Sequence, residues 1–163
     1  MAQANALTRA VAKVMSMPPV LRSHLITLMF TSQVRFAGTG GIKFVTLEEG
    51  RAVLTIRNRR KVQNHIGGIH AAAMALLAET ATGAVLGMTI PDTHIPLLKT
   101  MHVDYVRRAK GNLRAEATLP PELRQRVLTE EKGDFAVPIT VTDEDGQEPI
   151  KAQMVWAWVP KKK

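Results

Sequence analysis

The sequence has no cysteine, few aromatic residues and few serines, and each shortage excludes a class of function. Without cysteine there are no disulfides, no thiolate nucleophile and no cysteine-ligated zinc. Aromatic residues make up only 4% of the 163 residues, which argues against a stacking platform for single-stranded nucleic acid. The three serines, Ser16, Ser23 and Ser32, lie outside any G-x-S-x-G motif, so a serine-hydrolase nucleophile elbow is excluded.

Acidic residues are missing from the N-terminal region, where the first one is Glu48. Such a segment resembles a transit peptide in charge, but it lacks the serine and arginine enrichment of one. We therefore favour two surface helices, over 3–16 and 18–30, in an N-terminal helical extension, 1–36. The basic residues of the acid-free region are Arg9, Lys13, Arg22, Arg35 and Lys43.

The remaining residues, 37–163, have the pattern of one α+β domain. Glycine-rich 38–41 is expected to be a loop, and a long helix over 69–87 and a short one over 122–130 separate groups of strands. The six expected strands lie at 42–48, 51–60, 97–107, 112–118, 134–143 and 149–159. The net charge of +8 favours anionic partners, and the absence of cysteine suits a reducing compartment, so we expect a cytoplasmic protein.

The longest apolar run, 66–90, has the length of a membrane span. It is rich in alanine, however, and it contains four glycines and the charged Glu79. A charge in the middle of a span costs about 2.5–3.5 kcal/mol on insertion scales. We therefore expect a buried central helix and no membrane span.

Glu79 is the only acidic residue between Arg51 and Pro91, and it lies in the middle of this apolar helix. A buried carboxylate is costly without a partner, so two interpretations stand. Glu79 either forms a structural ion pair with an arginine of a strand, or it is a catalytic carboxylate that faces a cavity. The same helix stripe holds small residues at positions 71, 75, 83 and 87. They indicate either tight packing or room for a ligand.

The segment before the helix, 64–70, reads N-H-I-G-G-I-H. The first N–H groups of a helix lack internal acceptors and carry partial positive charge, so together with the Asn64 amide they can stabilise an oxyanion. The alternative is a plain turn with a helix cap. His65 and His70 are poorly spaced for one helical face, and we expect no metal and no cofactor.

The stretch from Asn64 to Gly83, N-H-I-G-G-I-H-A-A-A-M-A-L-L-A-E-T-A-T-G, resembles the signature of hotdog-fold acyl-CoA thioesterases of the phenylacetyl-CoA thioesterase type. The Asn, His and acidic positions are separated as in that family. The segment 103–111 is similar to its Tyr-x-x-(Arg/Ser)-Pro-Ala strand ending. The likeness is closest to an uncharacterised branch and covers about 40–159. It implies a hotdog fold, in which an antiparallel sheet of about six strands wraps the long helix, and a homodimer or a dimer of dimers.

The resemblance also implies roles for single residues in the hydrolysis of an acyl-CoA thioester to the free acid and coenzyme A. Asn64 and the N–H of Ala71 would hold the thioester oxygen, His70 would order the loop, and Glu79 would act as general base or nucleophile. The residues expected to contact the substrate are Gly68, Thr100, Arg107, Arg108 and Lys110, the last three through the coenzyme A phosphates. Two alternatives share the fold: an enoyl-CoA hydratase or dehydratase, and a non-catalytic acyl-CoA-binding protein.

The sequence departs from the family pattern at three points. Ala71-Ala72 replaces the usual Gly-Gly, glutamate replaces aspartate, and Leu98 stands where some relatives have Ser or Thr, with Thr100 as the nearby substitute. A second basic cluster, at 59–61, is a further candidate for phosphate binding.

Overall fold

The computed structural model describes residues 4–162 and contains five α-helices, seven strands and one 3-10 turn within them. Along the chain these are α1 (Ala6–Met15), α2 (Pro19–Gln33), α3 (Arg35–Gly40), β1 (Lys43–Glu48), β2 (Arg51–Ile56), η1 (Arg60–Val62), α4 (Ala71–Gly87), β3 (His94–Tyr105), β4 (Leu113–Thr118), α5 (Pro121–Thr129), β5 (Gly133–Val137), β6 (Ile139–Thr142) and β7 (Ile150–Pro160). The predicted α+β order is confirmed, and the six expected strands are all present.

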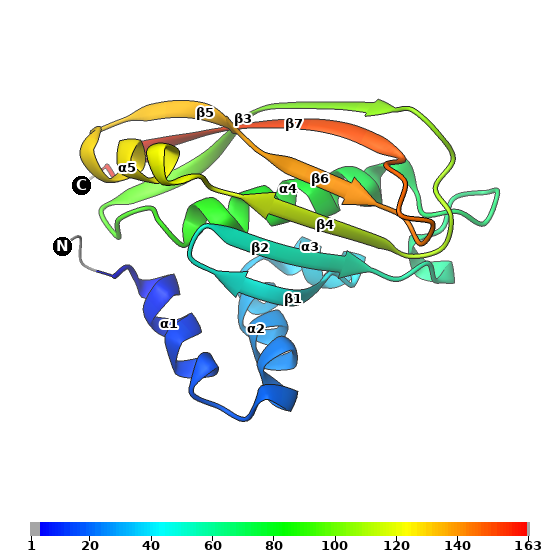
Figure 1. Cartoon of the computed structure of the whole chain (residues 1–163), viewed down its shortest axis with the longest axis horizontal. Helices are drawn as coiled ribbons and strands as arrows, with labels where there is room; N and C mark the ends of the chain where they lie inside the picture. The colour runs from blue at the N-terminus through cyan, green and yellow to red at the C-terminus, as the bar shows by residue number, and fades with distance from the viewer. Residues whose placement is uncertain (1–3, 163) are drawn as a thin grey trace.

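The strands form a four-stranded sheet, β1-β2-β4-β6, and a three-stranded sheet, β3-β7-β5, with antiparallel pairing throughout. The strand expected over 134–143 is divided, because Pro138 has no N–H to donate to a ladder. Its first part, β5, pairs with β7, and its second part, β6, pairs with β4. The chain thus passes from one sheet to the other at Pro138, and the two sheets curve around α4 (Figure 1).

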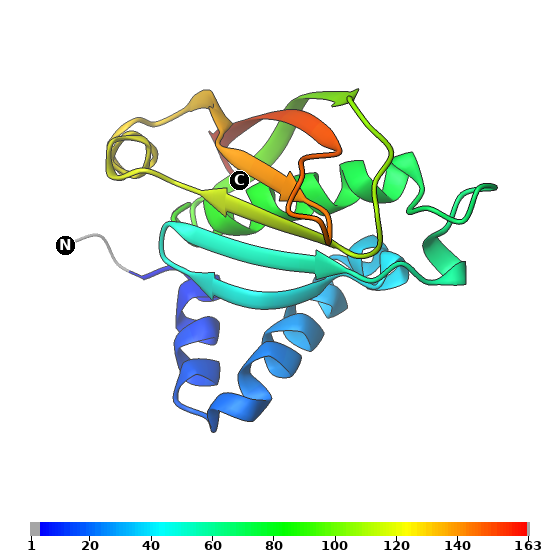
Figure 2. The same cartoon turned by 45° about the vertical axis from the view of Figure 1, so that its right-hand side comes forward.

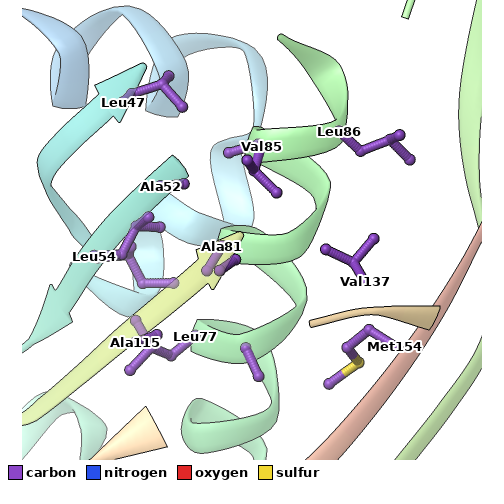
Figure 3. Packing of buried hydrophobic residues seen from close by; sticks show 14 of the residues in the cluster. Leu47, Ala52, Leu54, Leu77, Ala81, Val85, Leu86, Ala115, Val137 and Met154 are labelled. Atoms are coloured by element: carbon purple, nitrogen blue, oxygen red, sulfur yellow. The ribbon is translucent and has the colours of Figure 1, made fainter. Parts of the chain in front are cut away.

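Helix α4 is the centre of the core and contacts strands of both sheets. Its many alanines let the strands approach closely. In Figure 3, Leu77, Ala81 and Val85 point toward β2 and β4, whereas Leu86 points away from them, toward Val137 of β5. All four helix side chains are fully buried. The expected long helix is therefore confirmed, with its first residue at Ala71 rather than 69.

Helix α1 is attached to the C-terminal end of α4 by Asn5, which is only 6% exposed. The Asn5 Nδ2 group donates to the carbonyls of Gly87 (2.8 Å) and Ile90 (2.6 Å), and Oδ1 accepts from the N–H of Thr8 (2.8 Å). These bonds satisfy helix-end groups that have no partner inside a helix. The basic N-terminal segment is thus part of the packed structure from residue 4 onward, as the helical interpretation expects. Within residues 4–162, no helix has the length and apolar character needed to cross a membrane.

One local prediction is wrong: the segment expected as a loop, 38–41, is largely helical. Helix α3 runs through Gly40 and ends at Gly41, whose φ of +71° is the left-handed conformation that glycine adopts easily at a helix end. A Cβ at Gly41 would also overlap the guanidinium of Arg59. The proposed division after residue 36 falls inside α3 and stays a prediction.

Candidate active site

A pocket of about 290 Å³ lies where the loop before α4, the first turns of α4 and the end of β3 meet. We call it the amino-terminal pocket, because it lies at the amino-terminal end of α4. Its lining residues are Asn64, Ile66, Gly68, Ile69, Ala71, Met74, Tyr105, Arg107, Arg108 and Ala109. Five of the residues predicted from the sequence are therefore brought together by the fold, although they come from two segments about 40 residues apart.

Asn64 orders the loop that forms one wall of this pocket. Its Oδ1 accepts hydrogen bonds from the N–H groups of Ile66 and Gly68, both at 3.1 Å, and its own N–H donates to the Gly68 carbonyl at 2.8 Å. Gly67 completes the turn with a φ of +77°. The Asn64 Nδ2 group donates to no residue within 4–162, so it remains a donor for a ligand.

The N–H of Ala71 is a second donor in the same pocket, because Ala71 is the first residue of α4. It has no acceptor among the described residues. His70 caps the helix instead through Ala72, whose N–H donates to His70 Nδ1 at 3.1 Å, and the His70 N–H donates to the Val62 carbonyl at 2.8 Å. His70 is thus hydrogen-bonded both to the loop and to the start of α4, and its ordering role stays a prediction. Asn64 and Ala71, whose donors have no acceptor within residues 4–162, both line the amino-terminal pocket.

Tyr105 was not assigned a role from the sequence. Its hydroxyl donates to the carbonyl of Ala71 at 2.9 Å, which holds the start of α4 against the end of β3. Burial raises the pKa of the Tyr105 hydroxyl, so it stays protonated and keeps this bond. The only sequence signal was its place in the Tyr-x-x-Arg ending of the strand, which gives no function for the tyrosine by itself.

Two of the three predicted phosphate-binding residues already have carboxylate partners. Arg107 Nη1 lies 3.1 Å from Asp143 Oδ2, and Lys110 Nζ lies 3.0 Å from Asp145 Oδ2. Burial raises the pKa of Asp143, but hydrogen bonds from the backbone N–H groups of Gln147, Lys110 and Asp145 and the charge of Arg107 outweigh it, so the net pKa is lowered. Asp143 is therefore an ionised, buried anchor for this basic strand end.

Arg108 differs from its neighbours. Its Nη2 donates to the Ile66 carbonyl at 3.0 Å, and it forms no ion pair with a carboxylate of residues 4–162. Its charge is thus not neutralised by this part of the chain. The basic cluster at 59–61 also forms no ion pair within the described residues, but it does not line the amino-terminal pocket.

Glu79 lies in a different pocket, of about 240 Å³, which we call the mid-helix pocket. It is lined by Leu7, Phe30, Val34, Glu79, Thr80, Gly83, Gly87, Pro96 and Trp156. Glu79 is half-buried, and Thr80 Oγ1 donates to its Oε2 at 3.3 Å. Desolvation raises the pKa of Glu79, and the weaker effect of the Thr80 bond lowers it. No cation within residues 4–162 pairs with Glu79, so the strand arginine of the ion-pair interpretation is missing from this set.

The small residues after Glu79 make room for side chains of the same chain. A Cβ on Gly83 would come within 2.8 Å of the Trp156 ring, and one on Gly87 would lie 3.3 Å from Leu7. Trp156 is fixed there because its Nε1 donates to Thr82 Oγ1 at 2.9 Å. At these two positions the stripe of small residues therefore serves tight packing.

The distance along α4 separates the acid from the predicted oxyanion donors. Ala71 and Glu79 are eight residues apart, which is about 12 Å at a rise of 1.5 Å per residue. Glu79 does not line the amino-terminal pocket. Thr100 is exposed on β3 and lines neither pocket. Among residues 4–162 there is also no cluster of three or more side chains that could hold a metal ion.

The sequence model of a family described as a domain of unknown function, DUF4442, matches residues 22–159. The chain belongs to the DUF4442 family. No functionally curated protein matches this DUF4442 protein.

Solved structures of similar proteins confirm the hotdog fold and the resemblance to an uncharacterised thioesterase-like branch. PA5026 of Pseudomonas aeruginosa, described as a protein of unknown function and probable thioesterase, is 27% identical with a TM-score of 0.76, over 89% of the DUF4442 protein and 97% of PA5026. The thioesterase SAV0944 of Staphylococcus aureus is 22% identical with a TM-score of 0.63, and the match covers 77% of the DUF4442 protein and 99% of SAV0944. The thioesterase PA1618 of P. aeruginosa is 14% identical with a TM-score of 0.67, and the match covers 83% of the DUF4442 protein and 94% of PA1618. The last two likenesses concern the fold alone.

Proposed function

We propose that this DUF4442 protein hydrolyses acyl-CoA thioesters to the free acid and coenzyme A. The observation that carries the proposal is the pair of unoccupied donors, Ala71 N–H and Asn64 Nδ2, in a pocket that also holds the uncompensated charge of Arg108. Donors of this kind stabilise the oxyanion of acyl transfer, and the arginine suits the phosphates of coenzyme A. The likeness to PA5026, described as a probable thioesterase, supports the same chemistry.

The base comes from a second copy of the chain in this proposal. Because Glu79 lies about 12 Å along α4 from Ala71, it does not reach a carbonyl held by the Ala71 N–H of its own chain. A two-fold axis that runs perpendicular to α4 makes the α4 helices of two protomers antiparallel. Glu79 of one protomer then faces Asn64 and Ala71 of its partner, and each dimer has two complete sites.

Two exposed surfaces support a dimer of this kind. Strand β3 is a 12-residue edge strand that pairs with β7 on one side and with no strand of residues 4–162 on the other. Its exposed large side chains are Ile95, Leu97, Met101 and Tyr105. A long apolar edge strand pairs readily with another chain. On the α4 stripe, Ala71 is exposed, and Ala75 and Glu79 are partly exposed. A second copy that extends the sheet at β3 covers both.

The reaction in such a site follows from these positions. The thioester oxygen accepts hydrogen bonds from Ala71 N–H and Asn64 Nδ2, and negative charge develops there as the carbonyl carbon is attacked. Glu79 either removes a proton from the attacking water or attacks the carbon itself. In the first case the tetrahedral oxyanion collapses, the C–S bond breaks, and the proton on Glu79 passes to the coenzyme A thiolate. The raised pKa of Glu79 suits a group that takes and returns a proton.

Release of free thiol from a panel of acyl-CoA thioesters tests the proposal, with Glu79→Gln protein purified in parallel as the control for contaminating hydrolases. We expect thiol release by the natural protein and at least about 10²-fold less by the variant. Hydration of an enoyl-CoA without thiol release would identify a hydratase instead. Binding of acyl-CoA without turnover would identify a carrier protein. Either result contradicts the proposal.

The substrate contacts of Gly68 and Thr100 and the cytoplasmic location stay predictions.

A further inference from the structure

The turn that joins α1 to α2 exposes an unusual run of apolar side chains. Residues 15–21, M-S-M-P-P-V-L, are all exposed, and Ser16 is the only polar one. Val20 is 87% exposed, more than any other large apolar residue within 4–162, and Leu21 is 46% exposed. Pro18 and Pro19 set the shape of the turn, because Pro19 is the first residue of α2. We call residues 15–21 the hairpin tip.

The hairpin tip projects away from both sheets. In Figures 1 and 2 it forms the lower end of the molecule, with α1 and α2 rising from it to the body. Hydrogen bonds hold both helices of the hairpin to the rest of the protein. Asn5 donates to the Ile90 carbonyl just after α4. In α2, Ser23 donates to the Phe44 carbonyl of β1, and Thr27 accepts from the Phe44 N–H. The tip lines neither the amino-terminal pocket nor the mid-helix pocket. The hairpin tip is therefore an apolar surface that lies outside the proposed active site and is carried by two helices hydrogen-bonded to the rest of the protein.

The charged residues in the segment that carries the hairpin tip have one sign. No acidic residue occurs between residue 4 and residue 47, whereas Lys13 and Arg22 flank the tip on either side. Arg22 Nε donates to the Met17 carbonyl at 2.9 Å, which keeps the guanidinium at the turn. Neither Lys13 nor Arg22 forms an ion pair with a carboxylate of residues 4–162. The cations are thus free to meet an anionic partner.

We propose that the hairpin tip docks the protein on an anionic lipid surface. Apolar side chains at the end of a projecting hairpin enter the boundary between head groups and acyl chains, and the adjoining cations lie at the level of the anionic head groups. Apolar side chains adjoined by unpaired cations match the two layers of an anionic membrane interface, the acyl-chain boundary and the charged head groups. This docking does not depend on the proposed hydrolysis.

Co-sedimentation with lipid vesicles tests the docking. Vesicles of phosphatidylcholine alone are compared with vesicles that also contain phosphatidylglycerol, using the natural protein and a variant with Val20→Glu and Leu21→Glu together. Because both residues are exposed, the variant is expected to fold, and circular dichroism checks this. We expect binding to the anionic vesicles, at least about tenfold weaker binding by the variant, and weaker binding in high salt, where the Debye length falls from about 10 Å at 0.1 M to about 3 Å at 1 M.

A matched control is Leu128→Glu, which adds a charge at an exposed leucine of α5, 40% exposed, far along the sequence from the tip. We expect it to bind vesicles like the natural protein. Equal binding by the tip variant and the natural protein overturns the proposal, and so does no binding to anionic vesicles. Light scattering tests one more alternative, in which the tip is a contact between copies of the chain. A smaller assembly mass for the tip variant than for the natural protein would show this and overturn lipid docking.

Discussion

In the proposed function, the two pockets along α4 supply different parts of one reaction. The amino-terminal pocket has backbone and amide donors and a free arginine but no acid that could act as a base. The mid-helix pocket is almost entirely apolar, and Glu79 is its one charged group. The difference follows from position in the helix, since only the first turn has N–H groups without internal acceptors, while a carboxylate in the middle is surrounded by core side chains. Neither pocket of a single chain contains both the donors and the carboxylate that the proposed hydrolysis needs, so the proposal places the site between two chains.

The largest expected effect concerns the donors of the amino-terminal pocket. Asn64→Ala is expected to lower kcat by about 10²–10³-fold, the scale for one oxyanion donor. It also removes the acceptor for two backbone N–H groups, so the free energy of unfolding is expected to fall by about 1 kcal/mol for each bond.

Asn64→Asp separates the two roles of this side chain. Aspartate keeps an oxygen for the N–H groups of Ile66 and Gly68 but has no Nδ2 donor. We expect near-natural stability with the same large loss of kcat. Natural kcat in Asn64→Asp would mean that Asn64 only holds the turn.

The next effect concerns the acid of the mid-helix pocket. Glu79→Gln is expected to lower kcat at least about 10²-fold, since glutamine keeps the volume but cannot take a proton. Glu122→Gln, on the exposed start of α5, is the matched control and should keep full activity. If Glu79→Gln unfolds the protein while its soluble fraction keeps full specific activity, Glu79 is structural and the comparison between the pockets fails.

The pH dependence of the Glu79→Gln variant sharpens the same prediction. Burial raises the pKa of Glu79 in the folded chain, so the folded state binds more protons than the unfolded state between the two pKa values. The contribution of Glu79 to the free energy of unfolding is therefore present at low pH and is lost as pH rises through the raised pKa. At neutral pH the variant should be at least as stable as the natural protein. The acid limb of its kcat/KM profile, expected above the usual glutamate range, should disappear.

The smallest effect distinguishes the basic residues at the end of β3. Arg108→Ala is expected to raise KM for a coenzyme A thioester about five- to tenfold, which corresponds to about 1–1.4 kcal/mol, the net value of one ordinary hydrogen bond. KM for a short thioester without the nucleotide should stay unchanged. Arg107→Ala should chiefly lower the free energy of unfolding, because it leaves Asp143 buried without its cation. Equal KM changes for both thioesters would refute phosphate binding at Arg108.

Much of the fold follows from local patterns. The six strands and the long helix are readable because apolar residues recur with periods near 2 and 3.6. The misplaced details have local causes as well. Helix α3 is short and rich in glycine, which has a low helix propensity, so the sequence pattern predicts a loop there. Gly41 at its end is nevertheless a common helix stop signal. The division at Pro138 was visible as a proline inside a strand pattern, which marks an interruption of the ladder.

The site was only partly predictable, because its contacts join distant segments. The spacing of Asn64, His70 and Glu79 is visible in the sequence, whereas the hydrogen bonds that Asn64 and His70 form in the loop are visible only in the structure. The partners of Arg107 and Lys110 come from the turn at 143–145, and no local signal connects these segments. The separation of about 12 Å between Ala71 and Glu79 follows from helix rise alone. That figure conflicts with a site inside one chain and is the basis for a shared site.

Complementation between two inactive variants tests the shared site most directly. Asn64→Asp and Glu79→Gln proteins are unfolded together, mixed in equal amounts and refolded, with each variant refolded alone as the control. Random assortment makes half of the dimers mixed, and each mixed dimer has one intact site of two, so the account predicts recovery of about a quarter of natural activity. If the site lies within one chain, every chain in the mixture carries a defect. Activity no higher than that of the separate variants, in a mixture shown to contain mixed dimers, would contradict the account.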